Sequence, residues 1–79
     1  TVYLLRCADD TLYCGITNDL HRRVAAHNAK KGARYTRSRT PVNVAWLTQV
    51  ATKGQALRLE YALKQHSRSE KERLIAGTL

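Results

Sequence analysis

Two short, mainly apolar runs lie at the start of the chain. Residues 2–8 and 12–17 are rich in strand-forming side chains, and the acidic pair Asp9-Asp10 separates them. Strands joined by so short a link pair as a β-hairpin. The pattern therefore predicts two antiparallel strands at the beginning of the fold.

The length of the hairpin loop decides which side chains share a face of the sheet. If Ala8 pairs with Leu12 across a three-residue loop, Tyr3 lies opposite Thr17. Tyr3 and Tyr13 then point to the same face. A two-residue loop would separate the two tyrosines. A shared tyrosine face requires the three-residue loop, and we expect that arrangement.

The rest of the chain changes between helical and strand periodicity. Helical spacing of apolar residues predicts three helices, the first ended by Lys30-Lys31-Gly32, and strict alternation predicts a third strand. The second and third helices each open with a capping-box sequence, Thr or Ser followed three residues later by Gln or Glu. The predicted helices span about 19–29, 53–66 and 67–77, and the predicted strand spans 42–50.

The predicted order, β-β-α-β-α-α, corresponds to an α+β fold with a small three-stranded antiparallel sheet flanked by helices. The 79 residues suffice for one small domain, 1–79, and are too few for a dinucleotide-binding fold or a (β/α)₈ barrel. No apolar run approaches the roughly 20 residues of a membrane span, and the first residues lack the pattern of a signal peptide. We therefore expect a cytoplasmic protein without a membrane partner, with a monomer as the favoured state.

Basic residues are concentrated in one segment of the chain. The sequence has 14 Lys and Arg against 6 Asp and Glu, a formal charge of +8. Seven of the basic residues lie between Arg22 and Arg39 with no acidic residue among them, which leaves +1 for the rest (seven against six). Charge this segregated is typical of phosphate-binding surfaces, and the plainer alternative is an evenly solvated basic surface. The charge pattern favours a nucleic-acid partner.

The two cysteines, Cys7 and Cys14, are too few for a metal site or a disulfide framework. The three-residue hairpin loop also points them to opposite faces of the sheet. We predict two free thiols that pack as small apolar side chains, in a reducing compartment.

Five side chains are candidates for chemistry, and each has a plainer structural role. Tyr3 and Tyr13 share a face, but hairpin tyrosines most often pack in cores. Arg23 and His27 lie four residues apart on one edge of the first helix, where an arginine is usually solvated and a histidine usually satisfied in the core. Glu60 neighbours the apolar stripe of the long helix, where an ion pair along the helix is the plainer role. No single one of them outweighs its structural role.

Taken together, the candidates form a known pattern. Gly15 follows Tyr13 by two residues inside a predicted strand, where a glycine often marks a close approach of backbone or ligand. With Tyr3, the run 17–23 and His27, these residues resemble the paired motifs and following helix of the GIY-YIG nuclease superfamily.

The resemblance covers about residues 1–75. It is closest to small stand-alone bacterial members related to the excision-repair nuclease subunit and to intron-homing endonucleases, and the stretch 32–37 is typical of that group. The first motif reads Thr1-Val2-Tyr3, without the family's opening glycine, and the second has Cys14 in its middle place. Backbone and packing depend on these two positions, and the chemistry does not.

The resemblance implies a role for each candidate residue. By the family pattern, Tyr3 and Tyr13 are the motif tyrosines, and of these two candidates for the general base Tyr3 is favoured, with Tyr13 as a supporting phenol. Arg23 stabilises the charge of the transition state, and His27 assists the base or the water. Glu60 holds one divalent ion, Mg²⁺ or Mn²⁺, with water and phosphate oxygens as the other ligands. We expect all five side chains to converge on one side of the sheet.

The resemblance implies a metal-dependent endonuclease that hydrolyses DNA, structure- or single-strand-directed in repair or recombination, with RNA a less favoured partner. The alternative is a non-catalytic module with a nuclease-like fold that binds nucleic acid. In either case the basic loop, from Lys30 to Arg39, contacts phosphates. Tyr35 either stacks on an unpaired base or packs the loop onto the sheet. The expected contacts are Lys30, Lys31, Arg34, Tyr35, Arg37 and Arg39.

Overall fold

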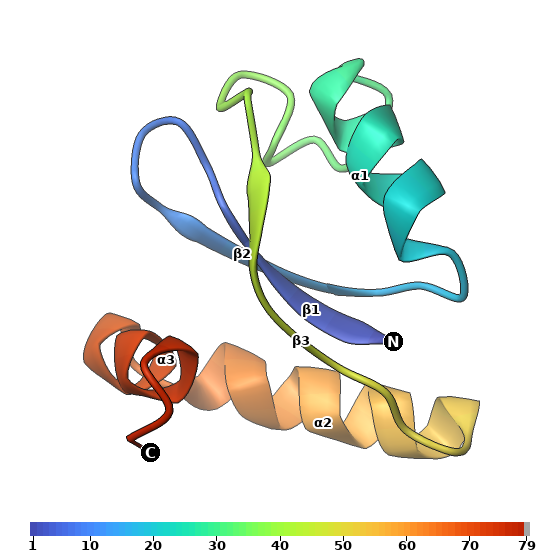
Figure 1. Cartoon of the computed structure of the whole chain (residues 1–79), viewed down its shortest axis with the longest axis vertical. Helices are drawn as coiled ribbons and strands as arrows, with labels where there is room; N and C mark the ends of the chain where they lie inside the picture. The colour runs from blue at the N-terminus through green and yellow to red at the C-terminus, as the bar shows by residue number, and fades with distance from the viewer. Residues whose placement is uncertain (79) are drawn as a thin grey trace.

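The structure is a computed structural model that describes residues 1–78. It has the predicted α+β class and the predicted order of elements, and every element lies within the range expected from the sequence (Figure 1). The elements are β1 (Val2–Arg6), β2 (Leu12–Ile16), α1 (Leu20–Asn28), β3 (Asn43–Thr48), α2 (Lys53–Gln65) and α3 (Arg68–Ile75).

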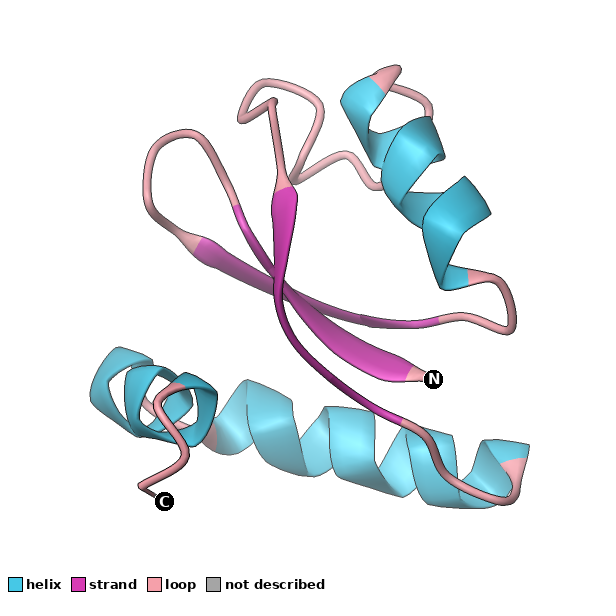
Figure 2. Cartoon of the chain, viewed as in Figure 1, coloured by secondary structure: helices cyan, strands magenta, loops and turns pink. Residues whose placement is uncertain are grey.

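The three strands form one antiparallel sheet in the order β2-β1-β3, so β1 is central and the other two are edge strands. Helices cover both faces (Figure 2). On one side, which we call the α1 face, Leu20 and Val24 of α1 pack against Tyr3, Leu5, Cys7 and Val42. On the other, the α2 face, the buried residues are Val2, Leu4, Cys14, Ala56 and Leu63, with residues of α3 packed beside them.

The hairpin register differs from the expected one by two residues. Tyr3 pairs with Gly15, not with Thr17, and the loop is Ala8-Asp9-Asp10, with Asp10 at a positive φ of 69°. The loop has the predicted three residues, but it begins one position earlier in the chain. A shift of two residues keeps every side chain on its face. The prediction that Tyr3 and Tyr13 share a face is therefore confirmed, although the predicted pairing partner is wrong.

A bulge interrupts the pairing of β1 with β3. Leu4 pairs with Trp46, whereas Leu5 pairs with Val44, so Ala45 is the extra residue on β3. The bulge carries Trp46 to the α2 face, while Val42 is buried on the α1 face. An unbroken strand over 42–50 would place Val42 and Trp46 on the same face, and the bulge instead places them on opposite faces.

The helix boundaries follow from their caps. Thr52 and Gln55 form a capping box at the start of α2, and Ser67 and Glu70 form another at the start of α3, as predicted. Both boxes satisfy amides that the first helical turn leaves without an acceptor.

The residue that ends α1 is not the expected glycine. The amide of Lys30 donates to His27 and that of Lys31 to Ala26, which is the Schellman arrangement. Lys30, with φ at 63°, takes the left-handed position that glycine usually fills. Gly32, which we expected at this helix end, therefore does not form the helix cap.

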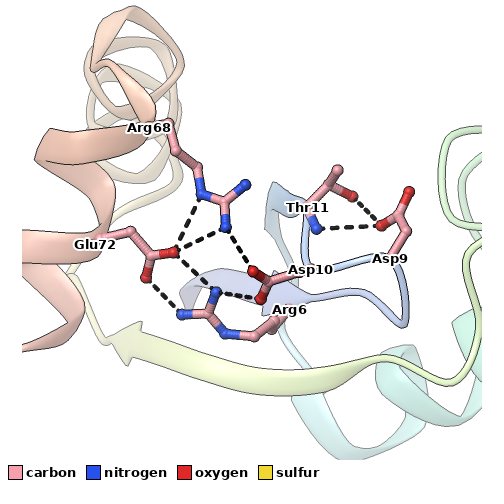
Figure 3. A network of polar contacts seen from close by, with 6 residues as sticks. All are labelled: Arg6, Asp9, Asp10, Thr11, Arg68 and Glu72. Carbon is pink, nitrogen blue, oxygen red and sulfur yellow. Dashed lines mark hydrogen bonds and ion pairs between the residues drawn. The ribbon is translucent and has the colours of Figure 1, made fainter.

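Ion pairs fasten the hairpin to α3 (Figure 3). Arg6 donates to the Glu72 carboxylate at 2.9 and 2.6 Å, and Arg68 donates to it at 3.1 Å. Asp10 accepts from Arg6 at 3.0 Å and from Arg68 at 3.1 Å. The hydrogen bonds from Arg6, and then those from Arg68, lower the pKa of Glu72 to about 2. Glu72 and Asp10 therefore stabilise the fold by holding the hairpin against α3.

Cys7 and Cys14 are both buried, on opposite faces of the sheet, as the hairpin geometry predicted. Burial raises the pKa of Cys14 to about 11, so its thiol stays protonated and packs as an apolar group. Within residues 1–78, no helix is both long enough and apolar enough to span a membrane.

Candidate active site

Tyr3 lies at the centre of the α1 face, and its ring crosses directly over Gly15. A Cβ atom at position 15 would lie 2.5 Å from the Tyr3 hydroxyl oxygen and 2.6 Å from Cζ, far inside van der Waals contact. The close approach expected at Gly15 is thus made by a side chain of the same protein. Gly15 is required here because only a glycine leaves room for the phenol.

His27 meets this phenol from α1. Its Nε2 lies 3.2 Å from the Tyr3 hydroxyl, and both side chains are almost fully buried, at 0% and 1% exposed. The imidazole also packs edge-on against the ring of Tyr13, with ring centres 5.3 Å apart. Three of the five predicted residues, Tyr3, Tyr13 and His27, therefore form one cluster.

Arg23 lies one helical turn before His27 and completes the α1 side of the cluster. Burial raises the pKa of the Tyr3 hydroxyl above 10.0, and the nearby Arg23 guanidinium lowers it by less. Burial also lowers the pKa of His27 below 6.5, and Arg23 adds to that effect. At neutral pH the buried pair is therefore an uncharged phenol beside an uncharged imidazole.

The other imidazole nitrogen is held by the basic loop. His27 Nδ1 lies 2.7 Å from the hydroxyl oxygen of Thr36, which is itself 0% exposed and donates to the Ala33 carbonyl at 3.0 Å. A Cβ at Gly32 would overlap the imidazole ring, so this glycine lets the loop close over His27. The roles of Gly32, Ala33 and Thr36 were not predicted from the sequence, and the signal that could have indicated them is the stretch 32–37, which is typical of the family's small stand-alone members.

Two of the predicted nucleic-acid contacts are engaged within the protein. The ring of Tyr35 stacks on Tyr13, with centres 5.8 Å apart, and the Arg39 guanidinium lies 4.0 Å from the Tyr35 ring centre. Arg39 also donates to Asp9 at 3.0 Å and to the Tyr35 carbonyl at 2.7 Å. Tyr35 therefore packs the loop onto the sheet, and Arg39 holds it there.

The remaining basic side chains of the segment have no acidic partner among residues 1–78. Among the described residues, the ion pair of this segment is the one between Arg39 and Asp9. Arg22 and Arg23 also line a shallow depression at the start of α1. In the described part of the chain, the unpaired cations of the segment are Arg22, Arg23, Lys30, Lys31, Arg34 and Arg37.

Glu60 does not join the cluster. It lies on α2, which packs against the opposite face, and its carboxylate raises the pKa of the Cys14 thiol there. The expectation that all five residues converge on one side of the sheet is thus wrong for Glu60, because the apolar stripe through Leu59 and Leu63 carries it to the α2 face. Glu60 therefore lies on the side of the sheet away from the tyrosines, on a helix that packs against β2, an edge strand.

Glu60 offers a metal ion a single carboxylate as a protein ligand. No three His, Cys, Asp or Glu side chains gather into a metal site in the described part of the chain. The Glu60 side chain is 20% exposed, and Lys64 Nζ lies 3.6 Å from its carboxylate. One carboxylate fits an ion that keeps several waters and takes phosphate oxygens as ligands, as Mg²⁺ does.

Comparison with known proteins gives the same pattern. A family model described as the GIY-YIG catalytic domain matches residues 1–73. A UPF0213 protein of Natronomonas pharaonis is 49% identical over 75 residues, which are 95% of this chain and 88% of the relative. A UPF0213 protein of Halobacterium salinarum is 51% identical over 73 residues, which are 92% and 95% of the two chains.

A solved structure has the same fold. The solution NMR structure of a UPF0213 protein from Bacillus halodurans superposes with a TM-score of 0.62 at 41% sequence identity. The match covers 95% of this chain and 80% of that one.

The contact between Tyr3 and Gly15 makes a direct prediction. Gly15→Ala should lower the free energy of unfolding by about 1–3 kcal/mol, because the added methyl group overlaps the buried phenol. Gly54→Ala is the matched control, since its Cβ would come no closer than 3.9 Å to the Thr52 hydroxyl oxygen and alanine favours a helix. Urea unfolding of both variants measures the difference, and equal stability would show that Tyr3 does not cross Gly15.

The lowered pKa of His27 makes stability depend on pH. Above about pH 6.5 the neutral imidazole contributes fully, and this contribution is lost as the pH falls through the lower folded-state pKa. Between pH 7 and 5 the free energy of unfolding should fall, by at most about 1.4 kcal/mol per pH unit for one proton. His27→Gln should flatten this dependence, whereas His21→Gln, at an exposed position of α1, should retain it. A His27→Gln curve parallel to wild type would contradict the assignment.

Proposed function

The chain belongs to the GIY-YIG nuclease family, and from this premise we propose that it is a divalent-metal-dependent endonuclease that hydrolyses DNA, as a single nuclease domain. The observation that carries the proposal is the buried contact between the Tyr3 phenol and His27 Nε2, with Arg23 beside it. A phenol, an imidazole and a guanidinium in one cluster supply a base, its partner and a cation for a phosphate.

In the proposed reaction Tyr3 is the general base. A water oxygen bonds to phosphorus as its proton passes to the Tyr3 oxygen, the ester P–O bond breaks, and the leaving oxygen takes a proton from solvent. Tyr3 can accept a proton only as the phenolate, which its raised pKa disfavours at neutral pH. The base therefore depends on its neighbours, His27 as proton acceptor and Arg23 as counter-charge.

Arg23 has the chemistry of a phosphate clamp. A guanidinium can donate two parallel hydrogen bonds to phosphate oxygens, and the charge it meets grows in the transition state. Tyr13 is half-buried beside His27, where its hydroxyl is the supporting phenol of the proposal. Arg22, in the same depression, extends the cationic surface toward the neighbouring phosphate.

The proposed metal ligand is Glu60, with Mg²⁺ or Mn²⁺ as the ion and water and substrate phosphate as its other ligands. When bound, such an ion neutralises phosphate charge and lowers the pKa of a coordinated water. Glu60 would act from the edge of β2, and its weak pairing with Lys64 would have to open.

The cations of the basic loop are the proposed DNA contacts, now without Tyr35 and Arg39. They project from irregular turns, so they are suited to the backbone and shape of a nucleic acid more than to base edges. We therefore propose that the substrate is single-stranded or branched DNA of repair or recombination. The proposed contacts are Lys30, Lys31, Arg34 and Arg37.

One observation favours a second function, a module that binds nucleic acid without cutting it. Glu60 lies on the face away from Tyr3 and is paired with Lys64, so the proposed metal ligand is not assembled with the base. Glu60→Gln separates the two functions. Abolished cleavage with unchanged DNA binding supports the enzyme, and behaviour identical to wild type supports the module.

Cleavage of labelled duplex, single-stranded and branched DNA in Mg²⁺ or Mn²⁺ tests the enzyme. Tyr3→Phe should lower the rate by about 10²–10⁴-fold, because it removes the proposed base. Tyr61→Phe, at a tyrosine that is 70% exposed on α2, should cut like wild type. Absence of cleavage by the wild type on all three substrates would refute the proposal, as would full activity of Tyr3→Phe.

The salt dependence of DNA binding tests the basic loop. Replacing Lys30, Lys31 and Arg37 by Gln should weaken binding to every sequence and reduce the log–log salt slope by roughly 0.7–0.9 for each phosphate that is no longer neutralised. The charge-matched control replaces three exposed cations of α2 and α3, namely Lys53, Arg58 and Arg73. An unchanged slope in the loop variant, or an equally reduced slope in the control, would move the DNA-binding surface elsewhere.

A further inference from the structure

The basic loop also contacts the candidate active site through Thr36, whose hydroxyl meets the ring nitrogen of His27 that does not face Tyr3. Tyr3, His27 and Thr36 are each no more than 1% exposed, so their polar atoms must find partners within the protein. They form a continuous chain: Tyr3 hydroxyl to His27 Nε2 at 3.2 Å, His27 Nδ1 to the Thr36 hydroxyl at 2.7 Å, and that hydroxyl to the Ala33 carbonyl at 3.0 Å.

The direction of each hydrogen bond follows from counting protons along this chain. The Ala33 carbonyl can only accept, so the single hydroxyl proton of Thr36 is directed to it. The Thr36 oxygen then accepts from His27 Nδ1, which must carry the proton of the neutral ring. This leaves His27 Nε2 without a proton and able to accept one from the Tyr3 hydroxyl.

The opposite tautomer is supported by a weaker hydrogen bond. It would have Nδ1 of His27 accept from the Ala33 amide, which lies 3.4 Å away, and would turn the Thr36 proton from the carbonyl to the ring. A distance of 3.4 Å is longer than an ordinary hydrogen bond to nitrogen, whereas the 3.0 Å hydrogen bond to the carbonyl, which this tautomer would break, is ordinary.

We propose that Thr36 is a positioning residue that holds His27 in the tautomer protonated at Nδ1, so that Nε2 takes the proton of Tyr3. In the step this prepares, the Tyr3 O–H bond breaks, its proton binds Nε2, and a phenolate and an imidazolium result. The phenolate then receives the proton of the attacking water, and the imidazolium releases its own to solvent through the Tyr3 hydroxyl, its hydrogen-bond partner. Only this kinetic consequence rests on the proposed function; the tautomer itself does not.

The tautomer can be read by NMR without any nuclease assay. Protein labelled with ¹⁵N in the histidine rings gives long-range ¹H–¹⁵N correlations that distinguish a protonated from an unprotonated ring nitrogen, and His27→Gln identifies the signals of His27. Wild type should show a protonated Nδ1 and a bare Nε2. A protonated Nε2 in the wild type would overturn the proposal, whatever the activity.

Two substitutions test the part played by Thr36. Thr36→Val keeps the shape but can neither accept from Nδ1 nor donate, so His27 should move toward the tautomer protonated at Nε2. Thr36→Ser keeps the hydroxyl and should keep the wild-type tautomer, and it carries the test alone if the valine variant does not fold. An unchanged tautomer in folded Thr36→Val, or a changed one in Thr36→Ser, would refute the role.

Kinetics then connect the tautomer to the reaction. At saturating DNA, Thr36→Val should lower kcat by about 10–100-fold with little change in KM, and Thr36→Ser should restore it. Normal kcat in a Thr36→Val protein whose tautomer has changed would show that the tautomer is irrelevant to the rate. If the wild type cuts no DNA, the proposed function fails while the NMR result stands.

Discussion

The whole α1 face depends on one constraint, that the polar contact between Tyr3 and His27 is almost fully buried. A buried polar group is stable only when every donor and acceptor finds a partner. In the described part of the chain, no buried side-chain nitrogen or oxygen lacks one. Two glycines make this possible, because Gly15 leaves room for the phenol and Gly32 leaves room for the imidazole. The hairpin, α1 and the loop are thus all positioned around one contact.

The two faces of the sheet differ in the side chains that they carry. The α2 face is apolar and covered by two helices, whereas the α1 face carries the tyrosines, the histidine and the cations. The bulge at Ala45 allows β3 to serve both faces, with Trp46 buried on one and Val42 on the other. Glu60 lies on the α2 face because its helix packs there through Leu63. Because Glu60 lies apart from the tyrosines, its substitution distinguishes the proposed nuclease from a module that only binds nucleic acid.

Charge is divided in a similar way. Apart from Glu60, the acidic side chains are engaged in holding the fold, as the Glu72 and Asp10 network between the hairpin and α3 illustrates (Figure 3). Asp9 holds Arg39, and Asp19 caps α1 through its side chain. The cations of α1 and the basic loop, Arg39 apart, are left without acidic partners among residues 1–78. The positive surface thus arises as much from where the acids are used as from where the lysines and arginines are placed.

The sequence by itself determined the order of elements, the capping boxes, the shared face of the two hairpin tyrosines and the position of the positive charge. These properties depend on side chains a few residues apart, whose spacing is visible in the chain. Only the tertiary structure decided that Tyr35 packs the loop, that Thr36 reaches His27, and that Glu60 lies on the other face. Each of these is a contact between elements distant in sequence, and its outcome depends on a register, a bulge or a glycine gap that no local pattern specifies.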